Sequence, residues 1–252
     1  MNISIISLLI KRQFKENFRI YTIGLLVLVA LLLFMFLIVH QWQDSFAGAV
    51  QNGVFIIGLF IAGGVFSNSM FQEFSSPQSG IWLLSIPAKH SEKVITSILI
   101  SVLFFLLIYF PIFYLADVLY LTITNKIGLE PILNPFKDGF YQFLFLYLLF
   151  NGIILLGSVI FNKQSFIKTL LLGILLIVAF NYINTLMLKF LIPEANVVSS
   201  TAFDSFLFRH QGENLKVLLL GNSDVLSSIF VRVILPILIW FAVWLKLKEK
   251  QI

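Results

Sequence analysis

Residues that could carry catalytic chemistry are few and widely separated in this chain of 252 residues. There is no cysteine, which removes thiolate nucleophiles and thiolate metal ligands. The three histidines, His40, His90 and His210, stand in different segments, and neither H-E-x-x-H nor G-x-S-x-G occurs. The G-x-x-x-x-G-K-[ST] loop that cradles nucleotide phosphates is absent as well. The sequence therefore predicts a protein that is not an enzyme and holds no cofactor or metal.

Ionisable residues at or near membrane depth are equally sparse, namely Asp117, Lys189 and Arg232. Asp117 and Lys189 fall at the outer ends of predicted spans, where they reach water, and Arg232 is close enough to an outer end to snorkel. A carrier driven by protons or ions normally places acidic residues deeper than this. A transporter with this sequence would therefore take its energy from another source.

Uncharged polar residues do occur within the apolar stretches, at Asn151, Asn181, Asn184 and Thr185. Asn181 shares one helix face with Asn184 and Thr185 because residues three and four apart are neighbours on a helix. Amides in lipid seek hydrogen-bond partners, so these side chains should face another helix or a lumen. Two interpretations stay open at this point, polar contacts that join helices and the lining of a substrate path.

Composition and helix length define the elements that must position these residues. Hydrophobic residues make up 59% of the chain and charged residues 12%, against about 45–50% and about 25% in soluble domains. A helix needs about 20 apolar residues to cross the hydrocarbon core of a bilayer. We expect an all-α integral membrane protein with one transmembrane domain, 1–252. Its six spans are predicted at 20–39, 53–71, 94–115, 140–161, 169–190 and 227–245.

The third apolar run continues past Pro111 to about Ile123, which exceeds one bilayer crossing. We expect this span to tilt, or to project beyond the outer surface after a kink at the proline.

The distribution of basic residues predicts the orientation. Most of the 17 Lys and Arg residues fall in segments on the same side as both termini, in a chain of net charge +5. Positive residues favour the cytoplasmic side, so both termini are predicted to be cytoplasmic in a multi-pass protein of the plasma (inner) membrane. The basic excess therefore indicates topology and contact with the lipid bilayer, and no nucleic acid partner.

The N-terminal residues 1–19 read as an amphipathic helix on the inner membrane surface. Apolar side chains recur at three- or four-residue spacing from Ile3 to Phe18, and the basic residues fall mainly on the other side. The alternative is a frayed tail of which only the basic cluster matters, as a topology anchor.

The loop between the second and third spans, Gln72–Lys93, is longer than a reversal of direction requires. Pro77 and Pro87 break it, and between them lies a short apolar piece, Gly80–Ser85. We expect this piece to lie at the inner membrane surface and to present a shaped apolar knob to a cytoplasmic partner.

This loop resembles the corresponding loop in the membrane subunits of type-2 ABC exporters. The similarity consists of an acidic residue, a glycine, a Leu-Leu-Ser-x-Pro run and a lysine, here Glu73, Gly80, Leu83-Leu84-Ser85-Ile86-Pro87 and Lys93. In that family the segment is a coupling helix that docks into a groove of the ATPase subunit. The resemblance implies a coupling role for Glu73, Gly80, Trp82, Leu83, Leu84, Pro87 and Lys93. It also implies an N-terminal connecting helix, six spans and a long outer loop before the sixth.

By this resemblance the chain is expected to be the permease subunit of an ATP-driven exporter. The ATPase would be a separate P-loop subunit, and a second permease subunit would complete a homodimer or heterodimer. Two alternatives remain open: a membrane scaffold or immunity protein that transports nothing, and a secondary carrier or channel. A separate ATPase partner distinguishes the first reading from both alternatives.

The outer segment between the fifth and sixth spans contains two apolar stretches, Ala202–Phe208 and Leu215–Gly221. Each is too apolar for a solvated loop and too short to span. We expect re-entrant or interfacial helices there, or partial disorder.

Overall fold

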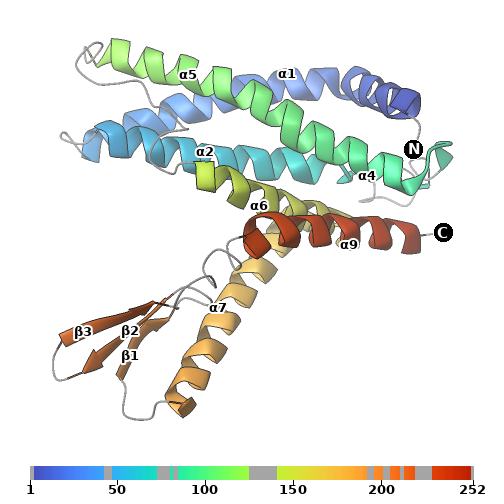
Figure 1. Cartoon of the computed structure of the whole chain (residues 1–252). Helices are drawn as coiled ribbons and strands as arrows, with labels where there is room; N and C mark the ends of the chain where they lie inside the picture. Colours follow the sequence, from blue (N-terminus) through green and yellow to red (C-terminus); the bar gives the residue numbers. More distant parts are fainter. Residues whose placement is uncertain are drawn as a thin grey trace.

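Six helices that are long and apolar enough to cross a membrane are present in the computed structural model. The structure describes residues 3–42, 47–72, 80–81, 85–124, 141–191, 196–200, 205–210, 213–218 and 229–250. The predicted number of spans is confirmed, and the chain is a multi-pass membrane protein. In chain order the helices are α1 (Ile3–Trp42), α2 (Ala47–Ser69), α4 (His90–Ile98), η2 (Leu99–Phe104), α5 (Phe105–Ile123), α6 (Tyr141–Ile160), α7 (Ser165–Leu191), η3 (Phe230–Ile234) and α9 (Leu235–Glu249) (Figure 1).

The helix predicted for residues 1–19 is present from Ile3, but it does not end before the first span. It continues without a break as α1, so no helix end separates residues 1–19 from the first span, and their position at the membrane surface stays a prediction. No glycine or proline occurs between Ile3 and Thr22 to end the helix. Its apolar face packs against protein, since Ile6 is buried and the rings of Phe14 and Phe104 meet edge to face with centroids 5.3 Å apart.

The third span is one continuous helix built from α4, η2 and α5, and it passes through Pro111 to Ile123. Its length agrees with the prediction, but the π-helical segment η2 was not predicted. The Phe105 N–H donates to Ile100 O, five residues back, as well as to Val102 O. The Ser101 carbonyl, which a regular α-helix would pair with Phe105 N–H, is thereby released.

The second π-helical segment, η3, has a local cause that η2 lacks. Leu235 N–H donates to Phe230 O, and the next residue is Pro236. A proline has no N–H, and its ring clashes with the carbonyl four residues earlier, here that of Arg232. The wider π turn relieves that clash. No proline lies near the end of η2. The π-helical geometry of η2 must therefore arise from the side chains that pack around it.

The segment between the fifth and sixth spans forms a sheet where short helices were expected, which corrects the all-α class for this part of the chain. Strands β1 (Asn196–Ser200), β2 (Ser205–His210) and β3 (Glu213–Leu218) pair antiparallel in the order β1-β2-β3. Phe206 pairs with Val217, and His210 pairs with Glu213. The β2–β3 connection is therefore two residues long and includes a glycine in the sequence, which favours a hairpin over two helices.

The core is aromatic and lies between α1, α2, α5 and α6. Phe36 stacks on Tyr120 with centroids 4.8 Å apart, and Phe55 meets Phe113 edge to face at 4.9 Å. Tyr109, in the same cluster, donates from its hydroxyl to the Phe55 carbonyl at 2.7 Å. A second cluster joins α2 and α4 to α6 and α9. These contacts place α1, α2, α5, α6 and α9 in one bundle (Figure 1).

Within the described part of the chain, helix α7 is attached to this bundle only through its first turns. Ser165 Oγ donates to Asn68 Oδ1 on α2 at 2.7 Å, and Thr169 is buried against α6. Beyond that point α7 leans away from the other helices (Figure 1). Only 6% of its most apolar 18-residue window is buried, against 44% for α6.

We expect Gly157→Ala to lower stability, because Gly157 is where α6 and α7 meet. A Cβ built there would stand 2.7 Å from Thr169 Cβ, closer than real carbons approach. Overpacking of this kind costs about 1–3 kcal/mol. Thermal unfolding in detergent measures the loss. The matched control is Gly173→Ala on α7, where a Cβ meets nothing within 4 Å; equal melting of the two variants would contradict the close approach.

Candidate functional site

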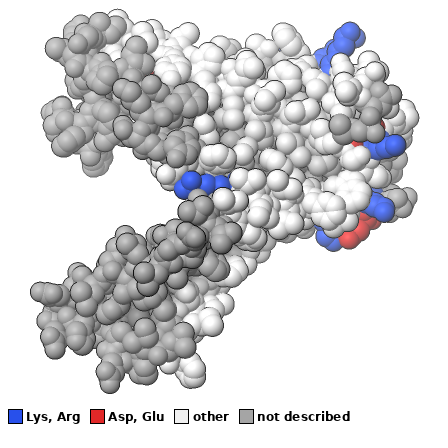
Figure 2. All heavy atoms as spheres, in the orientation of Figure 1, with Lys and Arg blue, Asp and Glu red and all other residues white. Residues whose placement is uncertain are grey.

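Both termini lie at one end of the bundle, and basic side chains gather there (Figures 1 and 2). We call it the basic end: residues 3–19 of α1, the start of α4, the α6–α7 turn and the last turns of α9. Lys250 Nζ donates to Asn162 Oδ1 at 3.0 Å, which ties α9 to that turn. Partial burial lowers the pKa of the Lys250 ammonium. The described basic residues of this end are Lys11, Arg12, Lys15, Arg19, Lys89, Lys93, Lys163, Lys168, Lys246, Lys248 and Lys250.

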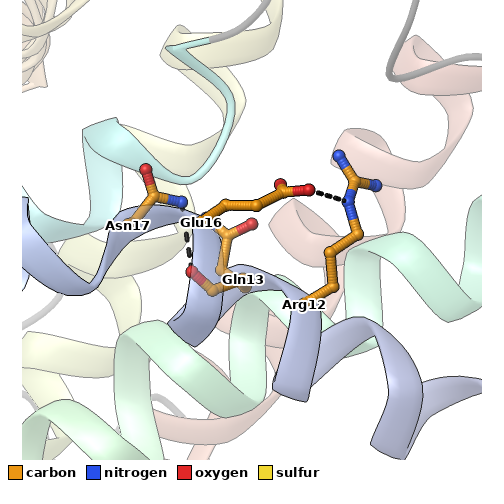
Figure 3. A network of polar contacts seen from close by, with 4 residues as sticks. All are labelled: Arg12, Gln13, Glu16 and Asn17. Atoms are coloured by element: carbon orange, nitrogen blue, oxygen red, sulfur yellow. Dashed lines mark hydrogen bonds and ion pairs between the residues drawn. The ribbon is translucent and has the colours of Figure 1, made fainter.

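Contacts within α1 fix part of this basic surface (Figure 3). Arg12 Nε donates to Glu16 Oε1 at 2.9 Å, and Asn17 Nδ2 donates to the Gln13 carbonyl at 3.2 Å. Both contacts join residues four apart on the helix, a spacing that adds only about 0.2–0.5 kcal/mol. Lys15 is exposed beside them, so positive charge remains available on this face.

The predicted coupling segment is only partly described. Gly80, Ile81 and Ser85 have helical backbone, and Pro87 is exposed. Gly80 is buried, whereas Ile81 is 53% exposed, so an apolar side chain stands at the surface here. Glu73, Trp82, Leu83 and Leu84, which also belong to the predicted coupling set, lie outside the described residues.

Lys93, the last of the predicted coupling residues, is only 5% exposed. Its carbonyl accepts a hydrogen bond from Ser97 Oγ at 3.0 Å. The preceding Glu92 is also buried and accepts a hydrogen bond from Lys89 N–H at 3.0 Å, which caps the first turn of α4. Both hydrogen bonds lie within the first turns of α4, and the burial of Glu92 and Lys93 shows that these turns pack inside the bundle, where Lys93 is not presented to a partner.

A polar cluster lies inside the bundle, formed by Ser67 on α2, Ser101 on η2, and Tyr147 and Asn151 on α6. All four residues are fully buried. Asn151 Nδ2 donates to Ser67 Oγ at 2.7 Å and to Ser101 Oγ at 2.9 Å. Asn151 Oδ1 has no hydrogen-bond partner within the described part of the chain. One amide therefore joins three helices, which fits the helix-joining interpretation of Asn151 and not the substrate-path one.

The polar cluster also accounts for the π-helical segment. The Tyr147 hydroxyl donates to the Ser101 carbonyl at 2.8 Å, the carbonyl that η2 releases from its regular helical partner. Buried carbonyls are costly without a donor, above all in a membrane. Tyr147 supplies that donor from α6, and Asn151 holds the Ser101 hydroxyl at the same place. Side chains of α6 thus stabilise the irregular turn in the third span.

The polar residues of the fifth span are placed differently. Asn181 is exposed and Asn184 half-buried, and neither amide makes a hydrogen bond within the part of the chain that is described. Thr185 Oγ1 donates to the Asn181 carbonyl at 2.8 Å, a contact within α7. The structure does not bring these residues together with Asn151. Among the described residues, neither the Asn181 nor the Asn184 amide hydrogen-bonds to another helix.

Two further outcomes concern charge and metal. Asp117 is fully buried on α5, so the expectation that it reaches water is wrong, because that side of α5 faces the aromatic core. Among the described residues, no group of three or more His, Asp or Glu side chains could hold a metal ion.

Sequence reasoning missed three of the four members of the polar cluster, Ser67, Ser101 and Tyr147. Ser67 begins a short polar run with Asn68 and Ser69 at the end of a span, and Ser101 and Tyr147 have apolar neighbours on both sides, so only the contacts with Asn151 distinguish the three residues. Comparison with family models, curated proteins and solved structures finds no match for this chain. The evidence on function is therefore structural: the six apolar helices, the basic end and the polar cluster.

Proposed function

We propose that the chain is the membrane-spanning permease subunit of an ATP-driven exporter and that a separate P-loop ATPase subunit powers it. The observation that carries the proposal is the segment around Gly80–Pro87, which joins two spans at the basic end and exposes Ile81 there. An exposed apolar side chain at a helical turn, beside many cations, suits docking to another protein by burial. The sequence contains no phosphate-binding loop of its own.

The proposed coupling path runs from this segment into the third span. The helix formed by α4, η2 and α5 begins three residues after Pro87, so a displacement of the docked segment would move the whole helix. The buried Glu92 and Lys93 fasten its first turn, and Ser101 fastens its π segment to α6. Motion would therefore reach α2 and α6 through the polar cluster, and alternating access would follow from rearrangement of two such bundles.

In this proposal the basic end faces the cytoplasm, as the excess of positive charge favours, and the protein lies in the plasma (inner) membrane. The ATPase would approach from that side, where both termini also lie (Figure 1). The sheet β1-β2-β3 would stand on the outer side, since it follows α7 and precedes η3.

Co-purification tests the proposal. The full chain, tagged at its C-terminus and extracted in mild detergent, should retain a P-loop ATPase that has no membrane span of its own. ATP hydrolysis by that subunit should change when the permease is bound. If the chain purifies without any ATPase from its native membranes, and added candidate ATPases neither bind nor respond, the exporter proposal is wrong and a non-transporting membrane role gains support.

A further inference from the structure

The third span contains a residue at η2 that a regular α-helix would not place there. The Phe105 N–H donates to the Ile100 carbonyl, five residues back, where an α-helix would join residues four apart. Single π turns of this kind recur inside α-helices, often at functional sites. The helix continues as α5, so the extra residue is confined to Leu99–Phe104. The segment η2 therefore holds a surplus residue that neither α4 nor α5 needs for its own helix.

The hydrogen bonds that hold the third span differ on the two sides of η2. In α4, the buried hydroxyls of Thr96 and Ser97 each donate to the carbonyl four residues back in the same helix, at 2.7 and 3.0 Å. Neither bond would break if α4 moved as a unit. In α5, the buried Tyr109 hydroxyl donates across to the Phe55 carbonyl of α2 at 2.7 Å. This bond anchors α5 to a neighbouring helix.

The Ser101 carbonyl, on η2 between these two parts, can take either of two partners. In the structure it accepts from the Tyr147 hydroxyl of α6 at 2.8 Å. In a regular α-helix it would accept from the backbone N–H four residues on. The Tyr147 hydroxyl would then need another acceptor. Asn151 Oδ1 is buried without a partner within the described part of the chain, and it lies close by, one turn along the same face of α6.

We propose that η2 is a hinge at which α4 shifts by one residue against α5, as the Ser101 carbonyl exchanges the Tyr147 hydroxyl for a backbone N–H. One residue of an α-helix corresponds to about 1.5 Å along the axis and about 100° of rotation. The surplus residue of η2 provides the length for this step, and the two sets of hydrogen bonds make it a switch between discrete states. The proposal rests on the proposed function, in which the segment around Gly80–Pro87 is displaced. It adds that α4 and α5 do not move as one body.

Removal of Leu103 tests the hinge, because Leu103 belongs to η2 and its side chain is 56% exposed. The deletion should turn η2 into regular α-helix while α4 and α5 keep their packing. The matched control is removal of Leu115, which is also 56% exposed but lies in the regular helix α5. There the deletion rotates one part of α5 against the other by about 100°. We expect the chain without Leu103 to melt like the parent chain, and the chain without Leu115 to melt lower.

Tyr147→Phe in two backgrounds shows whether the Ser101 carbonyl has changed its partner. In the parent chain this substitution should lower the melting temperature, because the carbonyl loses its donor. In the chain without Leu103, the carbonyl bonds within its own helix, so the same substitution should lower the melting temperature by less than half as much. An equal loss in both backgrounds would overturn the exchange of partners.

The ATPase readout tests the role of the hinge in coupling. The chain without Leu103 should still co-purify with the ATPase, because the segment around Gly80–Pro87 is unchanged. It should no longer change the rate of ATP hydrolysis, because α4 can no longer shift against α5. An unchanged response would overturn the hinge, and so would a chain without Leu103 that folds no better than the chain without Leu115. An ATPase that does not bind even the parent chain would instead overturn the proposed function, and the melting experiments would still decide whether Ser101 changes its partner.

Discussion

Replacing Leu83 and Leu84 with aspartate should leave the protein inserted and folded but abolish its association with the ATPase. A leucine that is fully buried contributes about 1.5–3 kcal/mol relative to its exposed state. Two of them would contribute about 3–6 kcal/mol to docking, and each 1.4 kcal/mol is about tenfold in affinity. Placing two charges in the contact adds a desolvation cost. Co-purification and stimulation of ATP hydrolysis should both fall to background.

The control for this variant is Ile3→Asp, another exchange of an exposed apolar residue at the basic end. Ile3 is 77% exposed and lies on α1, outside the proposed coupling segment. Both variants should reach the membrane in equal amounts and melt at the same temperature. If the doubly charged variant still binds and stimulates the ATPase like the parent chain, the coupling role of the segment is wrong, even if an ATPase partner exists. A loss in both variants would indicate a general effect of charge at this end.

The six spans could be predicted because they depend on a property summed over many residues. A stretch such as Phe140–Phe161 remains apolar whatever surrounds it, and only a helix satisfies its backbone in lipid. Helix ends depend on fewer residues. No glycine or proline stands near Arg19 and Ile20 to end a helix there. The amphipathic pattern alone therefore could not separate residues 1–19 from the first span. The structure joins them as α1.

The polar cluster and the sheet β1-β2-β3 could not be predicted, for different reasons. The cluster depends on the register of α2, η2 and α6, which places Ser67, Ser101 and Asn151 within hydrogen-bond distance. A single sequence does not encode that register locally. The sheet depends on pairing between segments that are each ambiguous, because Ser205–His210 is both apolar and rich in aromatic residues. Antiparallel pairing with β3 stabilises this segment as a strand.

Asn151→Leu should lower the free energy of unfolding, because Asn151 makes the hydrogen bonds that hold the polar cluster together. The substitution keeps the branched shape of the side chain, adds apolar volume and removes the bonds to Ser67 and Ser101. Contacts of this kind in membranes average about 0.6 kcal/mol and reach about 1.7, so the loss should be about 1–3 kcal/mol. Thermal unfolding in detergent should show it, and transport should fall only as folded protein is lost.

Tyr147→Phe removes the other bond to the π segment and should also destabilise, because the Ser101 carbonyl loses the hydroxyl that now serves it. An orphaned buried carbonyl costs about 1–3 kcal/mol. Tyr182→Phe is the matched control, since Tyr182 is 65% exposed on α7, and this variant should melt like the parent chain.

The combined Tyr147→Phe and Asn151→Leu variant should lose less stability than the sum of the two single losses, because both side chains act on Ser101. Strict additivity would mean that the two side chains do not hold the same turn, and unchanged melting of Tyr147→Phe would mean that the π segment does not depend on α6.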